Sequence, residues 1–285
     1  MPPRNAPHEP QDWARYKPGS TDGTTLMQAH FTEHAFERHS HDTYSIAVTS
    51  SGVQTFHCNG SLHASLPGDF ILFNPDQAHD GRRGTAEGFG YDMLYISADA
   101  MADCRDTSAG IDFGEHFTQP VVRDPGLAQA FRRLVSAEGQ PQERLRAEAL
   151  MRQFIAALLT RHGESRNTTP LRRAAALPLK RVREYLQAHY PQDIAVAQLA
   201  RQAGLSRAHL TRAFTQHFGI SPHVYLNAVR LHHARHAILQ GHALADVAAS
   251  CGFADQSHFT RRYKGAAGLT PSQWARQMRA SPTRR

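Results

Sequence analysis

The sequence predicts a multidomain α+β protein, with an N-terminal antiparallel β-barrel followed by two helices and a C-terminal all-α domain in which a long linker helix joins two helix-turn-helix motifs. Short apolar runs such as YSIAV and DFILF, separated by turn signals, fill residues 25–97 and are typical of antiparallel strands. Apolar residues then recur at helical spacing over 126–161. Near the end, HLTRAF at 209–214 is nearly repeated as HFTRRY at 258–263. These patterns together indicate two domains of different class.

The charge of the chain divides between two parts. The 285 residues carry a formal net charge of +7. Residues 1–170 hold 15 Lys and Arg against 21 Asp and Glu, whereas residues 171–285 hold 17 against 4. A basic block of this kind is expected of a nucleic-acid binder, because Lys and Arg displace the cations condensed on phosphates. We therefore expect a flexible arm over 1–24, a barrel domain over 25–162, a polar linker over 163–178 and a basic helical domain over 179–280.

Cysteine usage and hydropathy indicate a cytoplasmic protein. Cys58, Cys104 and Cys251 lie far apart without a C-x-x-C pair, so neither a disulfide framework nor a zinc knuckle is indicated. The N-terminus is polar and proline-rich, and the longest apolar run is far too short to cross a bilayer. The sequence shows no nucleophile elbow, phosphate loop or paired-carboxylate site. We therefore expect a soluble protein with no membrane partner and no catalytic residues, which is not an enzyme.

Two amphipathic helices are expected between the barrel and the linker. Leu127, Phe131 and Leu134 form the apolar stripe of the first helix, and Phe154 and Leu158 belong to that of the second. Such helices either cover the barrel or pair with a second copy of the chain. We expect a homodimer that uses them.

The repeat extends well beyond six letters. Ala200 and Gly204 match Ala248 and Gly252 at an offset of 48, and past the turn the offset becomes 49. Each copy is a short helix in which alanine allows close packing, a turn at glycine, and a second helix. Each copy therefore predicts a helix-turn-helix.

A single helix connects the two copies. It opens with Ser221 and Pro222, where the missing N–H of proline has no cost, and runs to about Gln240. Its length is roughly 28 Å at 1.5 Å per residue, and major-groove segments recur about every 34 Å on one face of B-DNA. We expect this helix to hold both second helices, termed reading helices, against the same face of one duplex.

The outward faces of the reading helices are basic and carry hydroxyl groups. Leu210 and Phe214 point inward in the first copy, as Phe259 and Tyr263 do in the second. Arginine to guanine is the commonest specific contact in DNA recognition. The predicted DNA-binding residues are Arg207, Ala208, Thr211 and Arg212 on the first reading helix, and Gln256, Ser257, His258, Arg261, Arg262 and Lys264 on the second.

The second copy reads A-x-x-x-G-F-x-D-x-S-x-F-x-R-x-Y-K-x-x-x-G-x-T-P from Ala248 to Pro271. With this pattern, the region 180–279 resembles the C-terminal DNA-binding domain of the AraC/XylS transcriptional regulators. The chain has Ala275 where that family usually places a basic residue. The resemblance implies double-stranded operator DNA as a partner, RNA polymerase if the protein is an activator, and base-facing positions at Ala208, Thr211, Arg212, Ser257, His258 and Arg261.

The stretch HSHDTY from His39, the run PGDFILFNP and the later GFGYDMLYI resemble the cupin-type sensor domain that many members of this family carry. In catalytic cupins, two histidines one residue apart, a glutamate and a distant histidine bind a metal. This chain has Ser45 and Ile46 where the glutamate would stand. Three imidazoles could still hold zinc, but we expect no metal and no cofactor. Instead, we expect a small polar effector to be bound by His39, His41, Tyr44, Asn74 and His79.

The predicted function is that of a sequence-specific DNA-binding transcriptional regulator, controlled by a small molecule bound in the N-terminal barrel. An alternative is a metal-dependent cupin enzyme, an isomerase or dioxygenase, fused to a DNA-binding module. A third is a constitutive DNA binder whose barrel only dimerises.

Overall fold

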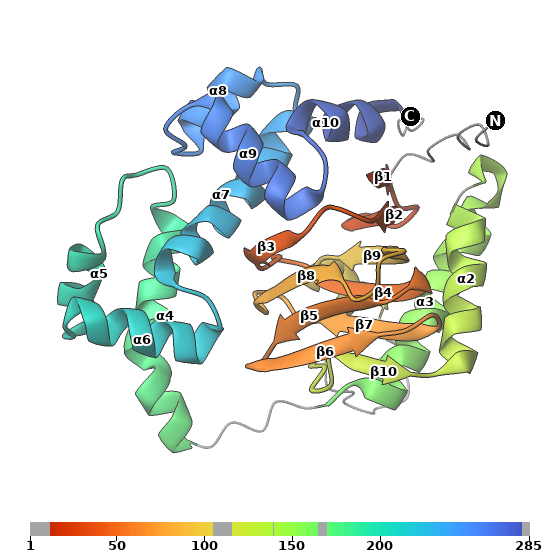
Figure 1. Cartoon of the computed structure of the whole chain (residues 1–285), viewed down its shortest axis with the longest axis horizontal. Coiled ribbons are helices and arrows are strands. Elements are labelled where there is room, and N and C mark those ends of the chain that lie inside the picture. Colours follow the sequence, from red (N-terminus) through yellow and green to blue (C-terminus); the bar gives the residue numbers. More distant parts are fainter. Residues whose placement is uncertain (1–11, 105–115, 139, 165–169, 281–285) are drawn as a thin grey trace, which may run out of the picture.

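The computed structural model describes residues 12–104, 116–138, 140–164 and 170–280. In the N-terminal half, the described strands form two antiparallel sheets (Figure 1). The larger sheet contains, in spatial order, β1 (Asp12–Pro18), β2 (Thr24–Phe31), β9 (Phe89–Ile96), β4 (Tyr44–Gly52), β7 (Asp69–Phe73) and β10 (Val121–Arg123). The smaller sheet contains β3 (Phe36–His39), β8 (His79–Arg83), β5 (Gln54–Cys58) and β6 (Ser61–Ser65).

The inner faces of the two sheets pack on each other. Phe56 of the smaller sheet lies in one apolar cluster with Phe73 and Tyr91 of the larger sheet. Because side chains alternate along a strand, Leu94 and Ile96 of β9 belong instead to a second cluster on the outer face. The antiparallel prediction is confirmed, but the described strands form two curled sheets rather than one closed barrel.

Helices cover the outer face of the larger sheet (Figure 1). They are α1 (Ala98–Cys104), α2 (Pro125–Glu138) and α3 (Arg144–His162), with a short 3₁₀ turn, η1 (Pro141–Glu143), between the last two. The ring of Phe70 on β7 lies 5.9 Å from that of Phe131 on α2 and 6.1 Å from that of Phe154 on α3. The apolar stripes of both helices are therefore buried on the sheet and are not available to a second copy of the chain.

Part of the arm that was expected to be flexible is an edge strand. Residues 12–18 form β1, which pairs with β2 from Asp12 opposite Phe31 to Pro18 opposite Thr25. The stretch alternates, and Ala14 and Tyr16 are its buried residues, which gives it a face to pack. Residues 1–11 of the expected arm lie outside the described residues.

The C-terminal half is helical. It contains α4 (Pro170–Ala188), α5 (Val196–Ala203), α6 (Arg207–Phe218), α7 (Pro222–Leu239), α8 (Leu244–Ser250), α9 (Gln256–Ala267) and α10 (Pro271–Ala280). The helix α4 includes residues 170–178, which were expected in the linker. This stretch is rich in Ala, Leu and Arg, which are strong helix formers, and proline is favourable at a helix start. Residues 165–169 lie outside the described part of the chain.

In both copies of the repeat, the first helix ends with the same backbone hydrogen bond. The N–H of Leu205 donates to the Ala200 carbonyl at 2.9 Å, and the N–H of Phe253 donates to the Ala248 carbonyl at 2.9 Å. These bonds satisfy carbonyls that the end of a helix leaves unpaired. The pairs α5–α6 and α8–α9 are thus two helix-turn-helix motifs joined by α7, as the sequence predicts.

Glycine is required at the turn of each copy. Gly204 has φ +66° and Gly252 has φ +80°, a region in which side chains with a Cβ are strained. The reading helix then begins with a capping side chain: Ser206 accepts from the His209 N–H and Asp255 from the His258 N–H. Sequence signals at these turns therefore fix both motifs locally.

The two halves of the chain lie against each other. The helices α7 and α9 contact β3, and α10 contacts β1 (Figure 1). One apolar cluster contains residues of both halves, such as Phe31 and Phe36 with Phe259 and Trp274. Among the described residues, no helix has the length and apolar character needed to span a membrane.

Candidate effector pocket and nucleic-acid interface

Three histidines converge where β3 meets β8. His39 ends β3 and lies opposite His79 in the strand register. Their ring centroids are 4.5 Å apart, and His41 lies 4.8 Å from His39 and 5.3 Å from His79. His41 stands in the connection between β3 and β4 rather than on the strand. The structure therefore brings together the three predicted histidines, with His39 at the end of β3 and His41 in the connection that follows it.

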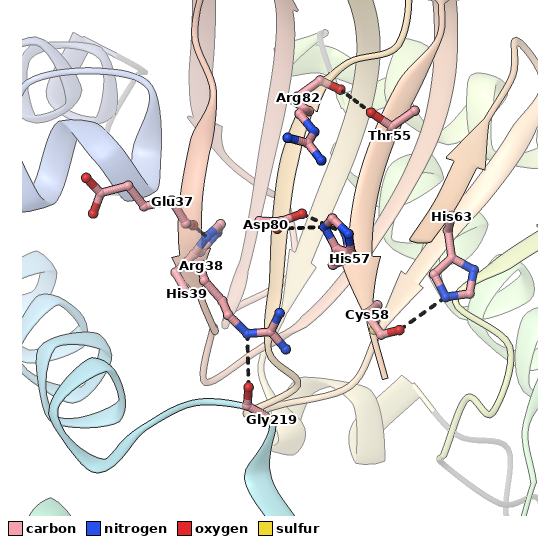
Figure 2. Close-up of polar contacts among 10 residues, drawn as sticks. All are labelled: Glu37, Arg38, His39, Thr55, His57, Cys58, His63, Asp80, Arg82 and Gly219. Atoms are coloured by element: carbon pink, nitrogen blue, oxygen red, sulfur yellow. Dashed lines mark hydrogen bonds and ion pairs between the residues drawn. The ribbon is translucent and has the colours of Figure 1, made fainter. Parts of the chain in front are cut away.

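Backbone carbonyls fix the tautomers of two of these rings. His39 Nδ1 lies 2.6 Å from the Glu37 carbonyl (Figure 2), and His79 Nδ1 lies 2.9 Å from the Gln77 carbonyl. A carbonyl only accepts, so each Nδ1 carries the hydrogen and each Nε2 keeps a lone pair. His41 Nε2 then donates to His39 Nε2 at 3.2 Å. Of these two Nε2 atoms, that of His79 therefore remains free to accept a hydrogen bond from an occupant.

Burial keeps these imidazoles neutral. It lowers the pKa of His39 to about 4 and holds the pKa values of His41 and His79 well below the usual range. The other histidines of the cluster lower the pKa of His41 and His79 further, and Arg235 of α7 also lowers that of His39 and His41. The rings therefore remain uncharged at neutral pH.

Among the described residues, this histidine cluster is the group of side chains that could hold a metal ion. One nitrogen from each of the three rings lies within 4.8 Å of the others. Three neutral imidazoles and one open position suit zinc. The neighbouring positive charge of Arg235, which already disfavours protonation of His39 and His41, opposes a bound cation.

Two predicted pocket residues lie elsewhere. Tyr44 is buried in the apolar cluster beneath α1–α3, with its ring edge-on to Phe117 at 6.0 Å. Both ends of the Asn74 side-chain amide bond the backbone of Phe117, donating to its carbonyl and accepting from its N–H at 2.8 Å. We therefore leave Tyr44 and Asn74 out of the pocket.

The sequence analysis missed other residues that stand beside the histidines. The ring of Tyr95 lies 5.2 Å from that of His41. Alternation along β9 places Tyr95 on the same face as Tyr91, and this signal could have identified it. Arg235 carried no such signal, because its position depends on the packing of the two halves.

A cavity of about 230 Å³ lies between the two halves of the chain, next to the cluster. Its lining residues from the N-terminal half are Ser40, His41, Asp42 and Asp76. Its lining residues from α4 and α7 are Gln187, Tyr225, Ala228, Val229, His232 and His233. An occupant of this cavity would contact both halves.

The predicted reading face of α6 is open to solvent. Arg207, Ala208 and Arg212 are exposed, and Thr211 is half-buried. The Thr211 hydroxyl donates to the Arg207 carbonyl at 3.0 Å. The basic groups of this face are therefore available to DNA.

The reading face of α9 lies beside the N-terminal half. Gln256, Ser257, Arg261 and Lys264 are exposed, and they line an open groove together with His34. His258 and Arg262, on the neighbouring side of the helix, are half-buried.

Three consecutive residues of β3 connect the histidine cluster to both motifs. Glu37 Oε2 accepts from Arg262 Nη1 of α9 at 3.0 Å. Arg38 Nε donates to the Gly219 carbonyl, directly after α6, at 2.9 Å (Figure 2). His39 belongs to the cluster. The residues that contact the two helix-turn-helix motifs thus stand only one and two positions before His39 of the cluster.

Family profiles match both halves of the chain. The profile described as "AraC-like ligand binding domain" matches residues 23–155, and the one described as "Helix-turn-helix domain" matches residues 199–277.

Curated relatives extend over most of the chain. YbfI of Bacillus subtilis, an uncharacterized HTH-type transcriptional regulator, is 28% identical over 223 residues, which cover 78% of this chain and 81% of the relative. RhaS of Pectobacterium atrosepticum, an HTH-type transcriptional activator, is 25% identical over 264 residues, covering 89% and 92%.

Solved structures share the architecture. An apo variant of ToxT from Vibrio cholerae has a TM-score of 0.59 at 13% identity, covering 90% of this chain and 98% of that one. Wild-type ToxT with a bound unsaturated fatty acid has a TM-score of 0.57 at 12% identity and covers 100% of both chains. These likenesses show the fold. The two profiles and the sequence relatives show that the chain belongs to the AraC family of transcriptional regulators, with an AraC-like ligand-binding domain ahead of a DNA-binding domain that contains two helix-turn-helix motifs.

Proposed function

We propose that an effector in the histidine cluster controls how α6 and α9 are presented to operator DNA. The observation that carries this proposal is the β3 segment, in which Glu37 bonds α9, Arg38 bonds the residue directly after α6 and His39 belongs to the histidine cluster. An effector acts only if it favours one arrangement of the domains over another. The unsaturated fatty acid bound by ToxT, which shares this fold, supports a small-molecule effector.

In this proposal, residues 25–162 form the sensor domain and residues 179–280 the DNA-binding domain. The base contacts come from Ala208, Thr211 and Arg212 on α6, and from Ser257, His258 and Arg261 on α9. Arg207, Gln256, Arg262 and Lys264 contribute mainly phosphate contacts, which position a protein on the duplex without specifying sequence. The protein acts in the cytoplasm, where it would contact RNA polymerase if it is an activator.

Selection of bound sequences from a random DNA pool, using the full chain, tests the DNA part. The connecting helix α7 has 18 residues, or about 27 Å. We expect two recognised segments one helical turn apart, about 10 bp between centres. Protection of duplex without any sequence preference would contradict the proposal. Thermal melting against a metabolite panel tests the sensor part, because a ligand that binds only the native state raises the melting temperature.

We also propose a homodimer through the solvent faces of α2 and α3, since their apolar stripes are buried on the sheet. Leu145, at the start of α3, is 81% exposed and stands next to Arg146. Analytical ultracentrifugation with and without operator DNA tests this. A monomer under both conditions at micromolar concentration would contradict it.

The histidine cluster is the observation that favours the second candidate, a metal-dependent enzyme of the cupin type. Elemental analysis of untagged protein separates the two candidates. Stoichiometric iron or manganese would favour chemistry in the sensor domain, whereas a metal-free protein that responds to effector would favour sensing.

A further inference from the structure

The cavity between the two halves of the chain has an acidic wall on its sensor side. Asp42 and Asp76 both line this space of about 230 Å³, and none of its described lining residues is a Lys or Arg. The backbone N–H of Asp76 donates to the His41 carbonyl at 2.7 Å, which holds the loop of Asp76 next to the segment that contains Asp42. Two carboxylates from separate loops therefore share one small space.

Asp42 is compensated by its neighbours. Its Oδ2 lies 2.7 Å from His232 Nδ1 of α7. Although burial acts in the opposite direction, the bond to His232 and the charge of Arg235 lower the pKa of Asp42. Asp42 therefore contributes a stable negative charge to the wall and is not the group that lacks a partner.

Asp76 is less well compensated. Its Oδ2 lies 3.6 Å from Arg183 Nη1, which is beyond hydrogen-bond distance. The Arg183 guanidinium lies over the Phe218 ring, 5.8 Å from its centre. Burial and the nearby charge of Asp42 raise the pKa of Asp76, and the charge of Arg183 offsets this only in part. A cation at hydrogen-bond distance from Asp76 would therefore stabilise its carboxylate.

Two further side chains of the same wall can accept hydrogen bonds. Ser40 lines the cavity, is 6% exposed, and its hydroxyl oxygen has no hydrogen-bond partner among the described residues. His41 also lines the cavity, and because its Nε2 donates to His39, its Nδ1 keeps a lone pair. A buried polar group without a partner is unfavourable. An occupant that donates hydrogen bonds would therefore stabilise this wall.

The opposite wall suits a short carbon skeleton. Ala228 and Val229 of α7 line it, together with the rings of Tyr225 and His233. The volume is below the roughly 300 Å³ at which drug-sized pockets begin. The cavity thus combines acceptors on the sensor side with apolar surface on the side of α7, and it has room for a compact molecule.

We propose that this cavity binds a small organic amine as the effector. Its ammonium group, which has three N–H donors and no acceptor, bonds Asp76 and Ser40, and its carbon skeleton lies against Ala228 and Val229. Because the acceptors belong to the sensor domain and the apolar contacts to α7, the amine binds both domains at once. This inference rests on the proposed function and specifies the chemistry of its ligand, which meets the histidine cluster at His41.

Thermal melting and calorimetric titration of the full chain test the inference with matched amines and alcohols. The probes are 1,4-diaminobutane with 1,4-butanediol, and benzylamine with benzyl alcohol. We expect at least one amine to raise the melting temperature while its alcohol does not. Asp76→Asn should weaken that amine by about 10- to 100-fold, as expected for a lost hydrogen bond between charged groups. Asparagine tolerates the positive φ of this position, +61°. Asp99→Asn, at an exposed position of α1, should bind the amine as the wild type does.

A second variant separates ligand binding from a structural role. Ser40→Ala removes the hydroxyl group without changing any charge. If this hydroxyl serves to bind the amine, the variant should bind it about two- to tenfold more weakly, while the melting temperature of the ligand-free protein stays unchanged or rises. A lower melting temperature together with normal amine binding would show a structural role for Ser40 and contradict the proposed contact.

The inference is overturned if no amine of the panel binds, if amines and alcohols bind alike, or if Asp76→Asn binds the amine normally. It is also overturned if magnesium chloride reproduces the shift in melting temperature, because the carboxylates would then hold a metal ion. Alcohols that alter DNA affinity would leave the proposed function intact while contradicting the amine. An amine that binds but leaves DNA affinity unchanged would support the site and contradict the proposed control of DNA binding.

Discussion

Glu37 of the sensor domain and Arg262 of the second reading helix form an ion pair, with 3.0 Å between Oε2 and Nη1. This pair joins residues 225 positions apart and engages a cation that we assign to the DNA interface. Arg262 cannot neutralise a phosphate and Glu37 at the same time. If Arg262 binds phosphate as proposed, this contact competes with DNA for α9.

Glu37→Gln should strengthen DNA binding. An exposed ion pair contributes up to about 1 kcal/mol, so we expect a gain of about two- to fivefold in affinity, measured by fluorescence anisotropy on a selected operator. Glu33→Gln is the matched control, because Glu33 pairs with Arg83 of its own domain at 2.8 Å. An equal gain from both variants would mean that only net charge matters.

Arg261→Ala should cost about 1–3 kcal/mol of binding free energy and relax the preference at one base position. Lys264→Ala, on the same exposed face of α9, should weaken all sequences alike and reduce the salt dependence by about one counterion. Binding measured across a set of single-base operator variants distinguishes the two effects. If Arg261→Ala also weakens every sequence equally, this residue contacts phosphate rather than a base.

Acid should destabilise the sensor domain through its buried histidines. The pKa of His39 is about 4 in the folded protein, below its usual value near 6.5. Below pH 6.5 the unfolded chain therefore binds protons that the folded chain excludes. The free energy of unfolding should fall as the pH drops from about 6.5 to about 4, by up to about 3 kcal/mol for this residue.

Urea denaturation at several pH values measures this effect. His39→Gln should flatten the dependence over that pH range. His209→Gln, at an exposed position of α6, should leave the dependence as it is. A wild-type stability that does not vary over this range would show that the cluster is protonated in the folded protein.

The two turn glycines should respond differently to alanine. Both have positive φ, so each substitution should cost about 1–2 kcal/mol of backbone strain. A Cβ on Gly204 would meet no atom within 4 Å, whereas a Cβ on Gly252 would lie 2.5 Å from the Pro191 carbonyl oxygen. Gly252→Ala should therefore be the more destabilising in urea denaturation. Equal losses would show that the loop at Pro191 moves at little cost.

Local signals explain why the two motifs were predictable. Each motif depends on a turn glycine and a capping residue that lie within a few positions of the reading helix. Because these signals are local, the repeat in the sequence predicts a repeated structure. The histidine cluster was partly predictable: His39 and His41 are neighbours in sequence, but His79 joins them only because β3 pairs with β8.

The errors arise where distant packing decides. Tyr44 begins β4, after a connection that does not preserve strand alternation, and it faces the helices. Asn74 is occupied by the backbone of Phe117. Arg235 affects the histidine cluster only because α7 packs on the sensor domain, and no periodicity in the sequence predicts that packing.

The side-chain amide of Gln277 on α10 hydrogen-bonds the edge of β1 as the backbone of a neighbouring strand would. Its amide oxygen accepts from the Tyr16 N–H at 2.7 Å and its amide nitrogen donates to the Ala14 carbonyl at 3.0 Å, on the free side of β1. The unpaired backbone groups of an exposed edge strand can pair with a strand of another chain. Separating the sensor domain from the rest of the polypeptide would expose this edge of β1. Solubility of the fragment, and not only its regulation, therefore depends on Gln277, which lies close to the opposite terminus.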